Sequence, residues 1–348
     1  MSILVINSGS TSIKYKLFSD DDVEIKQGVL EGVTNHQIAL KQVLREVGSL
    51  MDLRAVGHRV VHGGDKFIRP VVINDKILSE IEKFNHLAPL HNPYNLAGIK
   101  AAREYLPEAK QVAVFDTAFY AALPEAAKIY GLPLELTEKY NIRRFGFHGI
   151  SHKFVMAEAA KQLKKDVNKI NLITCHLGGG WSITAIRGGR PIDTSMGLTP
   201  LEGLVMMSRP GDLDAGIIFE LLKNLPGEIN REKVDQLYDL LNKQSGVKGL
   251  TGLDDYQKFL TSLSFGAEEA KLAFALLLHR LVKYIGAYWV ELEGKAEAIV
   301  FTGAIGAGNP MTRNAVMNKI TCLGKLPMLV IKTNEELMIA REVKQIIK

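Results

Sequence analysis

The pattern that most constrains the fold is a strand–turn–strand–strand unit that occurs twice in the chain. Its first copy runs from residue 3 to residue 30, where apolar, β-branched segments flank the polar turn 7–12. Its second copy runs from residue 172 to residue 192 around the turn 176–180. A chance likeness between two glycine-rich hairpins is the alternative to a repeat. We predict an internal duplication in which one copy opens each of two domains.

The rest of the chain alternates predicted helices with predicted strands. Apolar residues at helical spacing predict helices at 95–106, 151–164, 214–223 and 267–292. Segments rich in Val and Ile predict strands at 55–61, 111–115, 298–301 and 328–331. Ser151 is expected to cap the second helix, and the helix 267–292 is expected either in the core or at a dimer contact. This alternation is typical of an α/β fold with mixed sheets.

No Pro-rich or Ser-rich linker separates the two halves, so we place the domain boundary near Thr117. Residues 1–117 are expected to form the first domain, and residues 118–331 the second. The tail 332–348 is expected to cross back to the first domain.

The charge and cysteine content argue against several classes of protein. The 348 residues include 43 Lys and Arg and 38 Asp and Glu, a net charge of +5 that does not support a nucleic-acid surface. Two cysteines are too few for a disulfide framework. No signal peptide is evident, and no apolar segment reaches the ~20 residues that span a bilayer. We therefore expect a cytoplasmic protein that binds neither nucleic acid nor membrane.

Several turns that follow strands carry side chains suited to phosphate chemistry. The P-loop and Rossmann motifs are absent from the sequence, but turns rich in Gly and Ser at 7–12, 176–182 and 302–309 offer backbone N–H groups to phosphate oxygens. Asp116 follows the strand 111–115, a position typical of a carboxylate that binds Mg²⁺, with a local ion pair as the alternative. Arg59 and Arg209 lie beside glycine turns, where a guanidinium suits phosphoryl charge.

Seven of the nine histidines lie between residues 58 and 176. His148 and His152 are four residues apart, which is compatible with a metal pair on one face of a helix. No H-E-x-x-H pattern accompanies them, so core packing or hydrogen bonding is the alternative that we favour.

Seven segments, in order over nearly the whole chain, resemble the acetate kinase family. They are 7–14 (NSGSTSIK), 57–64 (GHRVVHGG), 88–93 (APLHNP), 115–119 (FDTAF), 144–149 (RFGFHG), 193–203 (DTSMGLTPLEG) and 333–336 (TNEE). The resemblance implies two duplicated actin-like (ribonuclease H-like) domains, with mixed β-sheets flanking a nucleotide cleft. It also implies a homodimer that transfers a phosphoryl group reversibly and in line from ATP to acetate, with Mg²⁺ or alternatively Mn²⁺.

The resemblance assigns roles residue by residue. The residues implied to be catalytic are Arg59, Asp116, His148 and Arg209. The residues implied to bind the acid are Arg59, Val61, Leu90, His91, Phe147 and Pro200, and the four apolar ones among them form its methyl pocket. The residues implied to bind the nucleotide are Ser10, Ser12, Lys14, His176, Gly178, Gly179, Gly180, Asp255, Gly303, Ala304, Ile305 and Gly306. Asn7 and Glu335 are implied to hold the metal.

Departures from the family pattern leave two alternatives open. Gly179 replaces the Asn that the family has in its HLGNG turn, and Ala304 and Ala307 replace a Gly and a Glu of its adenosine loop. The chain is also shorter than the usual family member, chiefly before Arg59. We expect the phosphate chemistry to be retained and recognition of the base to be relaxed. The alternatives are a kinase for propionate or butyrate, and a nucleotide-binding sensor without activity.

Overall fold

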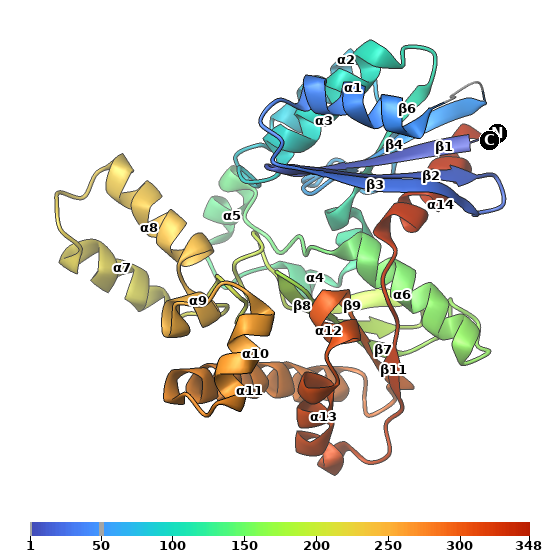
Figure 1. Cartoon of the computed structure of the whole chain (residues 1–348). Coiled ribbons are helices and arrows are strands. Elements are labelled where there is room, and N and C mark those ends of the chain that lie inside the picture. The colour runs from blue at the N-terminus through green and yellow to red at the C-terminus, as the bar shows by residue number, and fades with distance from the viewer. Residues whose placement is uncertain (1, 49–51) are drawn as a thin grey trace. The chain divides into compact units, whose positions relative to one another are not determined.

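A computed structural model describes residues 2–48 and 52–348. The chain divides into two compact units (Figure 1). Unit 1 comprises Met1–Ala122, Phe147–Phe154 and Thr333–Lys348, and unit 2 comprises Leu123–Gly146 and Val155–Lys332. The chain passes from unit 1 to unit 2 after Ala122, five residues beyond the expected boundary, and the tail belongs to unit 1. The short segment Phe147–Phe154 also belongs to unit 1, although it lies within the range 118–331 expected for the second domain.

Unit 1 is built on a six-stranded mixed sheet with the order β3-β2-β1-β4-β6-β5. Its strands are β1 (Ser2–Ser8), β2 (Ser12–Ser19), β3 (Glu24–Glu31), β4 (Leu53–Val60), β5 (Val71–Val72) and β6 (Lys110–Phe115). The first three strands are antiparallel, whereas β4 runs parallel to β1 and β6 runs parallel to β4. The carboxyl ends of β1, β4 and β6 therefore meet at one edge of the sheet.

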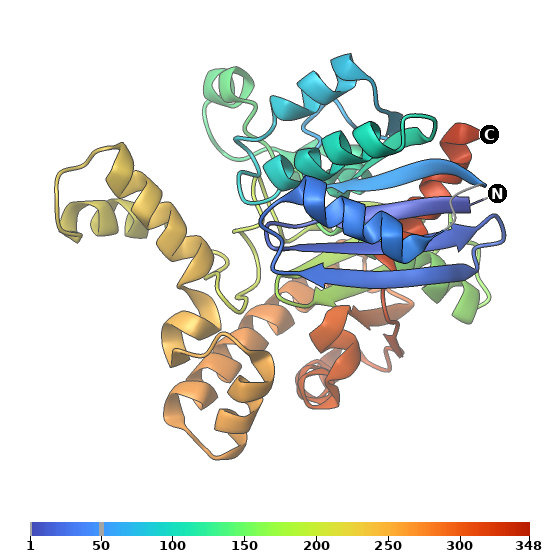
Figure 2. The ribbon, with the colours of Figure 1, turned by 45° about the horizontal axis from the view of Figure 1, so that its top comes forward.

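Helices cover both faces of this sheet (Figures 1 and 2). The helical elements of the unit are α1 (His36–Val47), α2 (Asp75–Glu82), α3 (Asn92–Tyr105), the 3₁₀ helix η1 (Asp116–Ala122) and α14 (Glu335–Ile347). Because side chains alternate along β4, Val56 packs in the core beneath α1 while Gly57 faces α14. A Cβ atom at Gly57 would lie 2.8 Å from Cγ2 of Ile339, so glycine permits this close approach of helix to strand.

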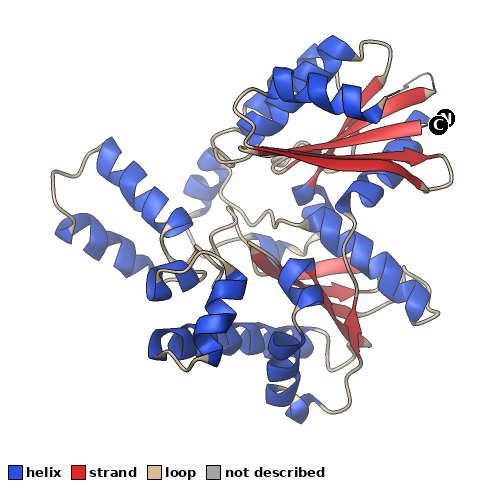
Figure 3. Cartoon of the chain, in the orientation of Figure 1, coloured by secondary structure: helices blue, strands red, loops and turns tan. Residues whose placement is uncertain are grey.

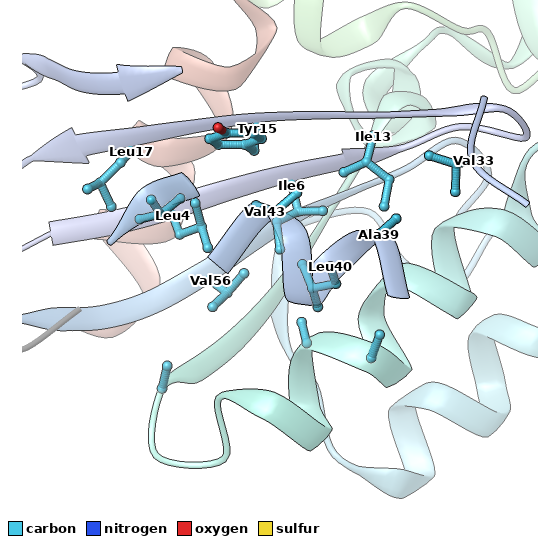
Figure 4. Packing of buried hydrophobic residues seen from close by; sticks show 14 residues of the cluster. Leu4, Ile6, Ile13, Tyr15, Leu17, Val33, Ala39, Leu40, Val43 and Val56 are labelled. Atoms are coloured by element: carbon cyan, nitrogen blue, oxygen red, sulfur yellow. The ribbon is translucent and has the colours of Figure 1, made fainter. Parts of the chain in front are cut away.

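The core on the α1 side consists mainly of aliphatic side chains, with Tyr15 of β2 among them, that pack between sheet and helix (Figure 4). Leu4 and Ile6 of β1 contribute from the sheet, and Leu40 and Val43 contribute from α1. Each of these side chains is at most 1% exposed. Burial of a Leu or Ile side chain contributes ~1.5–3 kcal/mol, so this cluster fixes the position of β1 and of the turn that follows it.

Unit 2 contains a five-stranded sheet with the order β11-β10-β7-β8-β9. Its strands are β7 (Leu172–Leu177), β8 (Trp181–Arg187), β9 (Arg190–Thr194), β10 (Ala298–Thr302) and β11 (Met328–Val330). The strands β7, β8 and β9 form an antiparallel meander, and β10 runs parallel to β7. This repeats the relation of β1, β2, β3 and β4 in unit 1, as the predicted duplication requires. The predicted α/β fold with two mixed sheets is confirmed.

Unit 2 is richer in helices than unit 1 (Figure 3). The helical elements outside unit 1 are α4 (Glu125–Lys128), α5 (Leu134–Tyr140), α6 (Gly149–Gln162), α7 (Ala215–Asn224), α8 (Arg231–Lys243), α9 (Gly246–Thr251), α10 (Tyr256–Ser264), α11 (Glu268–Glu291), α12 (Gly303–Gly308), α13 (Pro310–Lys319) and the 3₁₀ helix η2 (Thr321–Leu323); α6 begins in unit 1 and ends in unit 2. In the part of the chain that the structure describes, no helix is both long and apolar enough to cross a membrane.

The four predicted helices are present as α3, α6, α7 and α11. The expected cap at Ser151 is wrong, because α6 begins at Gly149 and Ser151 lies in its first turn. The Ser151 hydroxyl donates instead to Oγ1 of Thr333, 2.9 Å away. A Ser before an apolar run resembles a cap in sequence, but here the hydroxyl joins α6 to the segment that precedes α14.

His58 on β4 makes the stability of the fold depend on pH. It is 2% exposed, and its Nε2 lies 2.8 Å from Oε1 of Gln111. Burial lowers the pKa of His58 to about 4, whereas the unfolded chain titrates near 6.5. Between these values the unfolded chain binds a proton that the folded chain does not, so stability is lost as the pH falls through this range.

Acidification from pH 7 to pH 5 should therefore lower the free energy of unfolding by about 2 kcal/mol through His58 alone. The measurement is urea unfolding at the two pH values for the wild type and for His58→Gln, whose amide can replace the bond to Gln111. The variant should lose about 2 kcal/mol less than the wild type. An equal loss in both proteins would show that His58 is not responsible, and His86→Gln provides an exposed-histidine control.

Candidate active site

The carboxyl ends of the parallel strands in unit 1 bring together three of the predicted functional residues. Asn7 lies near the end of β1 and Arg59 near the end of β4. Asp116 follows β6 directly and opens η1, where it is 1% exposed. This edge of a parallel arrangement is where α/β proteins commonly bind ligands, because the loops and helix ends that follow the strands lie side by side there.

Arg59 forms the central ion-pair cluster of this edge. Its Nε and Nη2 donate to Oδ1 and Oδ2 of Asp116 at 3.1 and 2.6 Å. Its Nη1 lies 3.3 Å from Oε2 of Glu335, the first residue of α14. Burial opposes the charge on Arg59, but the carboxylates of Asp116 and Glu335, with a smaller contribution from Glu336, outweigh burial and raise the pKa of Arg59 above its usual value. The cluster therefore holds a permanently charged guanidinium in a fixed, bidentate geometry.

Two buried asparagines at the start of α3 fasten the ends of β1 and β4. Asn95 accepts a hydrogen bond from the Val61 N–H (3.1 Å) and donates to the Ser8 carbonyl (2.6 Å). Asn92 accepts from the His62 N–H (3.0 Å) and donates to the His62 carbonyl (2.9 Å). Sequence reasoning does not identify these asparagines as functional, although their i, i+3 spacing at a helix start is visible in the sequence.

The apolar residues assigned to acid binding in unit 1 are Val61, Leu90 and Phe147. Val61 and Phe147 are buried, and Leu90 is half-buried. The Phe147 ring packs edge-on against the His62 ring with centroids 5.5 Å apart. The Phe147 carbonyl accepts from the Tyr120 hydroxyl at 2.9 Å, which anchors the backbone beside His148.

His148 and His91 each lie directly before the first residue of a helix. His148 precedes α6 and has a left-handed backbone with φ of 56°. Residues other than Gly adopt this region infrequently, and such strain is concentrated at functional sites. His91 precedes α3 but does not cap it with its side chain. No group of three or more His, Cys, Asp or Glu residues able to hold a metal occurs within residues 2–48 and 52–348.

The first predicted phosphate turn is closed by its own backbone. The Gly9 N–H donates to the Ser12 carbonyl at 2.8 Å. Ser10 and Lys14 are exposed, and Ser12 is half-buried. Their polar groups are therefore accessible to a ligand.

Arg209 of unit 2 has surroundings opposite to those of Arg59. Its Nη1 donates to the Pro200 carbonyl at 3.2 Å and lies 3.7 Å from the sulfur of Met206. Among the described residues, no carboxylate forms an ion pair with Arg209. Burial lowers the pKa of Arg209, and only the more distant Tyr238 counteracts this effect. A half-buried cation without an acidic partner is suited to bind an anion.

The structure brings the two predicted phosphate turns of unit 2 together. Gly303 has φ of 80°, and a Cβ atom there would lie 2.4 Å from the Leu177 carbonyl oxygen of β7. Gly306 packs against the Leu177 side chain, and the Gly178 N–H donates to the Gly180 carbonyl at 3.0 Å. The segment predicted as a turn at 302–309 forms mostly the helix α12, and the start of this helix is therefore a neighbour of the end of β7 and the turn that follows it.

The remaining residues of the predicted nucleotide set differ in their local roles. Ile305 is buried, whereas Gly179 and Ala304 are exposed. Asp255 caps α10, with Oδ1 accepting from the Lys258 N–H at 2.8 Å. Asp255 therefore has a structural role in the helix, separate from the nucleotide binding that the resemblance assigns to it.

The predicted site residues thus form two groups. Unit 1 holds Asn7, Ser10, Ser12, Lys14, Arg59, Val61, Leu90, His91, Asp116, Phe147, His148 and Glu335. Unit 2 holds His176, Gly178, Gly179, Gly180, Pro200, Arg209, Asp255, Gly303, Ala304, Ile305 and Gly306. Each unit therefore holds one of the two arginines that are assigned to catalysis. Arg59 in unit 1 is neutralised by carboxylates, whereas Arg209 in unit 2 has no carboxylate partner among the described residues.

Comparisons with known proteins agree on one family. The model of the Acetokinase family matches residues 31–328. The acetate kinase of Lachnoclostridium phytofermentans is 40% identical over 401 aligned residues, covering 100% of both chains. That alignment is longer than the 348 residues of this chain, so the relative contains insertions that this chain lacks.

Solved structures give the same result. The crystal structure of Porphyromonas gingivalis acetate kinase superposes with a TM-score of 0.92 at 34% identity, covering 100% of both chains. A propionate kinase from Francisella tularensis superposes with a TM-score of 0.90 at 38% identity, covering 98% of both chains.

Removal of the Asn95 side chain should weaken unit 1 where the proposed site residues are held. Asn95→Ala leaves the buried Val61 N–H and Ser8 carbonyl without this partner, at a cost of about 3 kcal/mol. Asn74→Ala removes only the exposed cap of α2 and should cost about 1 kcal/mol. Urea unfolding of both variants makes the comparison. Equal losses would contradict a special role for Asn95.

Proposed function

The chain belongs to the acetokinase family, and from this membership we propose that it is a carboxylate kinase that uses ATP to phosphorylate acetate. The reaction gives acetyl phosphate and ADP and is reversible. An oxygen of the acetate carboxylate forms a bond to the γ-phosphorus, the bond from that phosphorus to the β–γ bridging oxygen breaks, and ADP retains the electron pair. Acetate is already ionised at neutral pH, so no side chain has to remove a proton.

The observation that carries this proposal is the different neutralisation of the two arginines. Arg59 is held by Asp116 and Glu335, which preorganises it for phosphoryl charge without reorientation during the reaction. Arg209 has no carboxylate partner among the described residues and is free to pair with the anionic acid. Phosphoryl transfer depends chiefly on such positioning and charge stabilisation. These two roles are assigned to one arginine in each unit.

We assign the methyl group of the acid to Val61, Leu90, Phe147 and Pro200, on the basis of the resemblance. All four are apolar, and two of them are buried in unit 1. His148 and His91 support the reacting groups, and the strained backbone of His148 is consistent with a fixed orientation. The glycine turns and Ser10, Ser12 and Lys14 are assigned to the phosphates.

The oxygen donors at the strand ends of unit 1 fit Mg²⁺. Asn7, Asp116 and Glu335 supply amide and carboxylate oxygens, and Mg²⁺ commonly takes one or two carboxylates together with substrate phosphates. Mn²⁺ suits the same donors. When bound, the ion would neutralise charge on the transferring phosphoryl group. Arg59 keeps both carboxylates oriented toward this edge of the sheet.

A kinase for propionate is the second candidate, because the chain is 38% identical to a propionate kinase of the same fold. One methylene changes binding by only ~1–3 kcal/mol, so small differences in the methyl pocket decide the preference. We also propose a homodimer in the cytoplasm. The mass of the protein in solution tests the dimer, and a monomer at micromolar concentration would contradict it.

Trapping of the acyl phosphate with hydroxylamine tests the proposed function. Purified protein with Mg-ATP should give acyl hydroxamate from acetate, and the yields from propionate and butyrate rank the two candidates. Absence of hydroxamate with all three acids would reject both kinase assignments and favour a nucleotide sensor.

Substitution of either arginine should lower turnover, but only substitution of Arg59 should also lower stability markedly. Arg59→Gln and Arg209→Gln should each lower kcat by ~10²–10³, because each removes a donor to developing charge. Arg59→Gln should also destabilise the protein by about 3 kcal/mol, since it leaves Asp116 buried without this cation. Arg209→Gln should change stability by less than about 1 kcal/mol, since it breaks no ion pair.

Steady-state kinetics and urea unfolding of both arginine variants provide the measurements. Normal turnover in either folded variant would remove that arginine from the mechanism. Equal loss of stability would contradict the proposed difference in neutralisation.

The metal assignment predicts a changed requirement for Mg²⁺. Asp116→Asn and Glu335→Gln keep the size of each side chain but remove a charge, so the Mg²⁺ concentration for half-maximal activity should rise by about tenfold or more. Glu336→Gln, one residue further along α14, is the matched control. An unchanged Mg²⁺ dependence in both variants would leave Asp116 and Glu335 only as partners of Arg59.

A further inference from the structure

Residues 194–202, here called the strap, connect β9 to the loop that carries Arg209. We propose that Tyr130, Arg144 and Glu202 are positioning residues that hold the strap, and through it Pro200 and Arg209, in the geometry required by the acid. This inference rests on the proposed function, because it concerns the acid-binding role assigned to these two residues.

Arg144 binds the strap through consecutive backbone carbonyls. Its Nη1 donates to the carbonyls of Thr194, Ser195 and Met196 at 3.0, 3.4 and 3.2 Å. Its Nη2 donates to Oε1 of Glu202 at 2.6 Å, and its Nε donates to the Ala127 carbonyl at 3.1 Å. Every nitrogen of this guanidinium therefore has a protein partner. Arg144 pairs with a carboxylate, Glu202, which Arg209 does not do among the described residues.

Glu202 and Tyr130 close the strap on itself. The Tyr130 hydroxyl donates to Oε2 of Glu202 and accepts from the Leu198 N–H at 3.0 Å. Both side chains press against Gly197, where a Cβ atom would lie within 2.0 Å of each of them. The Gly197 carbonyl also accepts from the Phe145 N–H at 3.0 Å. Arg144 thus joins the start of the strap to Glu202 at its end, and Tyr130 joins Leu198 to the same Glu202.

The strap transmits this fixation to the proposed acid-binding groups. Pro200 lies two residues before Glu202, and its carbonyl accepts from Arg209. Gly203, which follows Glu202, forms two hydrogen bonds with Asp212. The Gly203 N–H donates to Oδ1 of Asp212 (2.8 Å), and the Gly203 carbonyl accepts from the Asp212 N–H (3.0 Å). The loop with Arg209 is therefore closed at its base, and a shift of Glu202 displaces Pro200 and Arg209 together.

Glu202 and Arg144 are only partly buried, with side chains 30% and 17% exposed. A partly exposed ion pair contributes little to stability, whereas a displacement of reacting groups by about 1 Å can cost ~10²-fold in rate. The cluster should thus affect acid binding more than folding.

The test uses Glu202→Gln, which keeps the size of the side chain but removes the charge that orients Arg144, and Tyr130→Phe as a milder second variant. Glu297→Gln is the matched control, because Glu297 also pairs with a cation (Lys165) and a backbone N–H (Asn171), and is 23% exposed in the same unit. The measurements are KM and kcat for acetate and propionate, KM for ATP, and the melting temperature.

We expect both strap variants to raise KM for acetate by about tenfold, to change the ratio of kcat/KM for propionate and acetate by at least threefold, and to leave KM for ATP within twofold. The control should match the wild type. Unchanged KM and unchanged acid preference in folded variants, or a uniform fall in kcat alone, would overturn the inference. If the wild type makes no acyl phosphate, the proposed function fails and this inference fails with it.

Discussion

The ion-pair cluster of Arg59, Asp116 and Glu335 is the interaction on which the proposed site depends. It joins the end of β4, the residue after β6 and the first residue of α14, three points that are far apart in sequence. A parallel sheet places the first two side by side, but only the return of the C-terminal tail supplies Glu335. The burial of Asp116 is tolerated because Arg59 neutralises it in a bidentate geometry. Chain topology thus brings the three residues together, and the opposite charges stabilise their contact.

The two assigned arginines differ in how their charge is neutralised, and the proposed reaction uses them for different tasks. In unit 1 the arginine is neutralised and oriented. In unit 2 Arg209 keeps its charge without a carboxylate partner among the described residues, at the cost of burial. Arg144 of the same unit is instead fully engaged with the strap. An unneutralised, partly buried cation is unfavourable for stability and useful for binding an anion, which is the usual compromise of a functional site. The proposed binding of the acid then depends on how rigidly the backbone holds Arg209.

The sequence was most informative where local patterns decide the structure. Alternating apolar residues predict the repeated strands, and Asp116 is identifiable because it follows a strand that is buried along most of its length. Asn92, Asn95, Tyr130 and Glu202 were not identified, because their roles depend on hydrogen bonds to segments distant in sequence. The cap at Ser151 was predicted wrongly for the same reason, since its partner Thr333 is 182 residues away. The helix α14 was not predicted, although its heptad-like apolar spacing is visible.

Binding of acetate in the absence of nucleotide separates recognition of the acid from turnover, and so tests the proposed role of Arg209. Titration of the wild type, Arg59→Gln and Arg209→Gln with ¹³C-labelled acetate, followed by NMR, gives the three dissociation constants. We expect Arg209→Gln to weaken binding by at least tenfold and Arg59→Gln to weaken it less, because Arg59 is already paired with Asp116 and Glu335. Wild-type affinity in folded Arg209→Gln would show that Arg209 does not bind the acid.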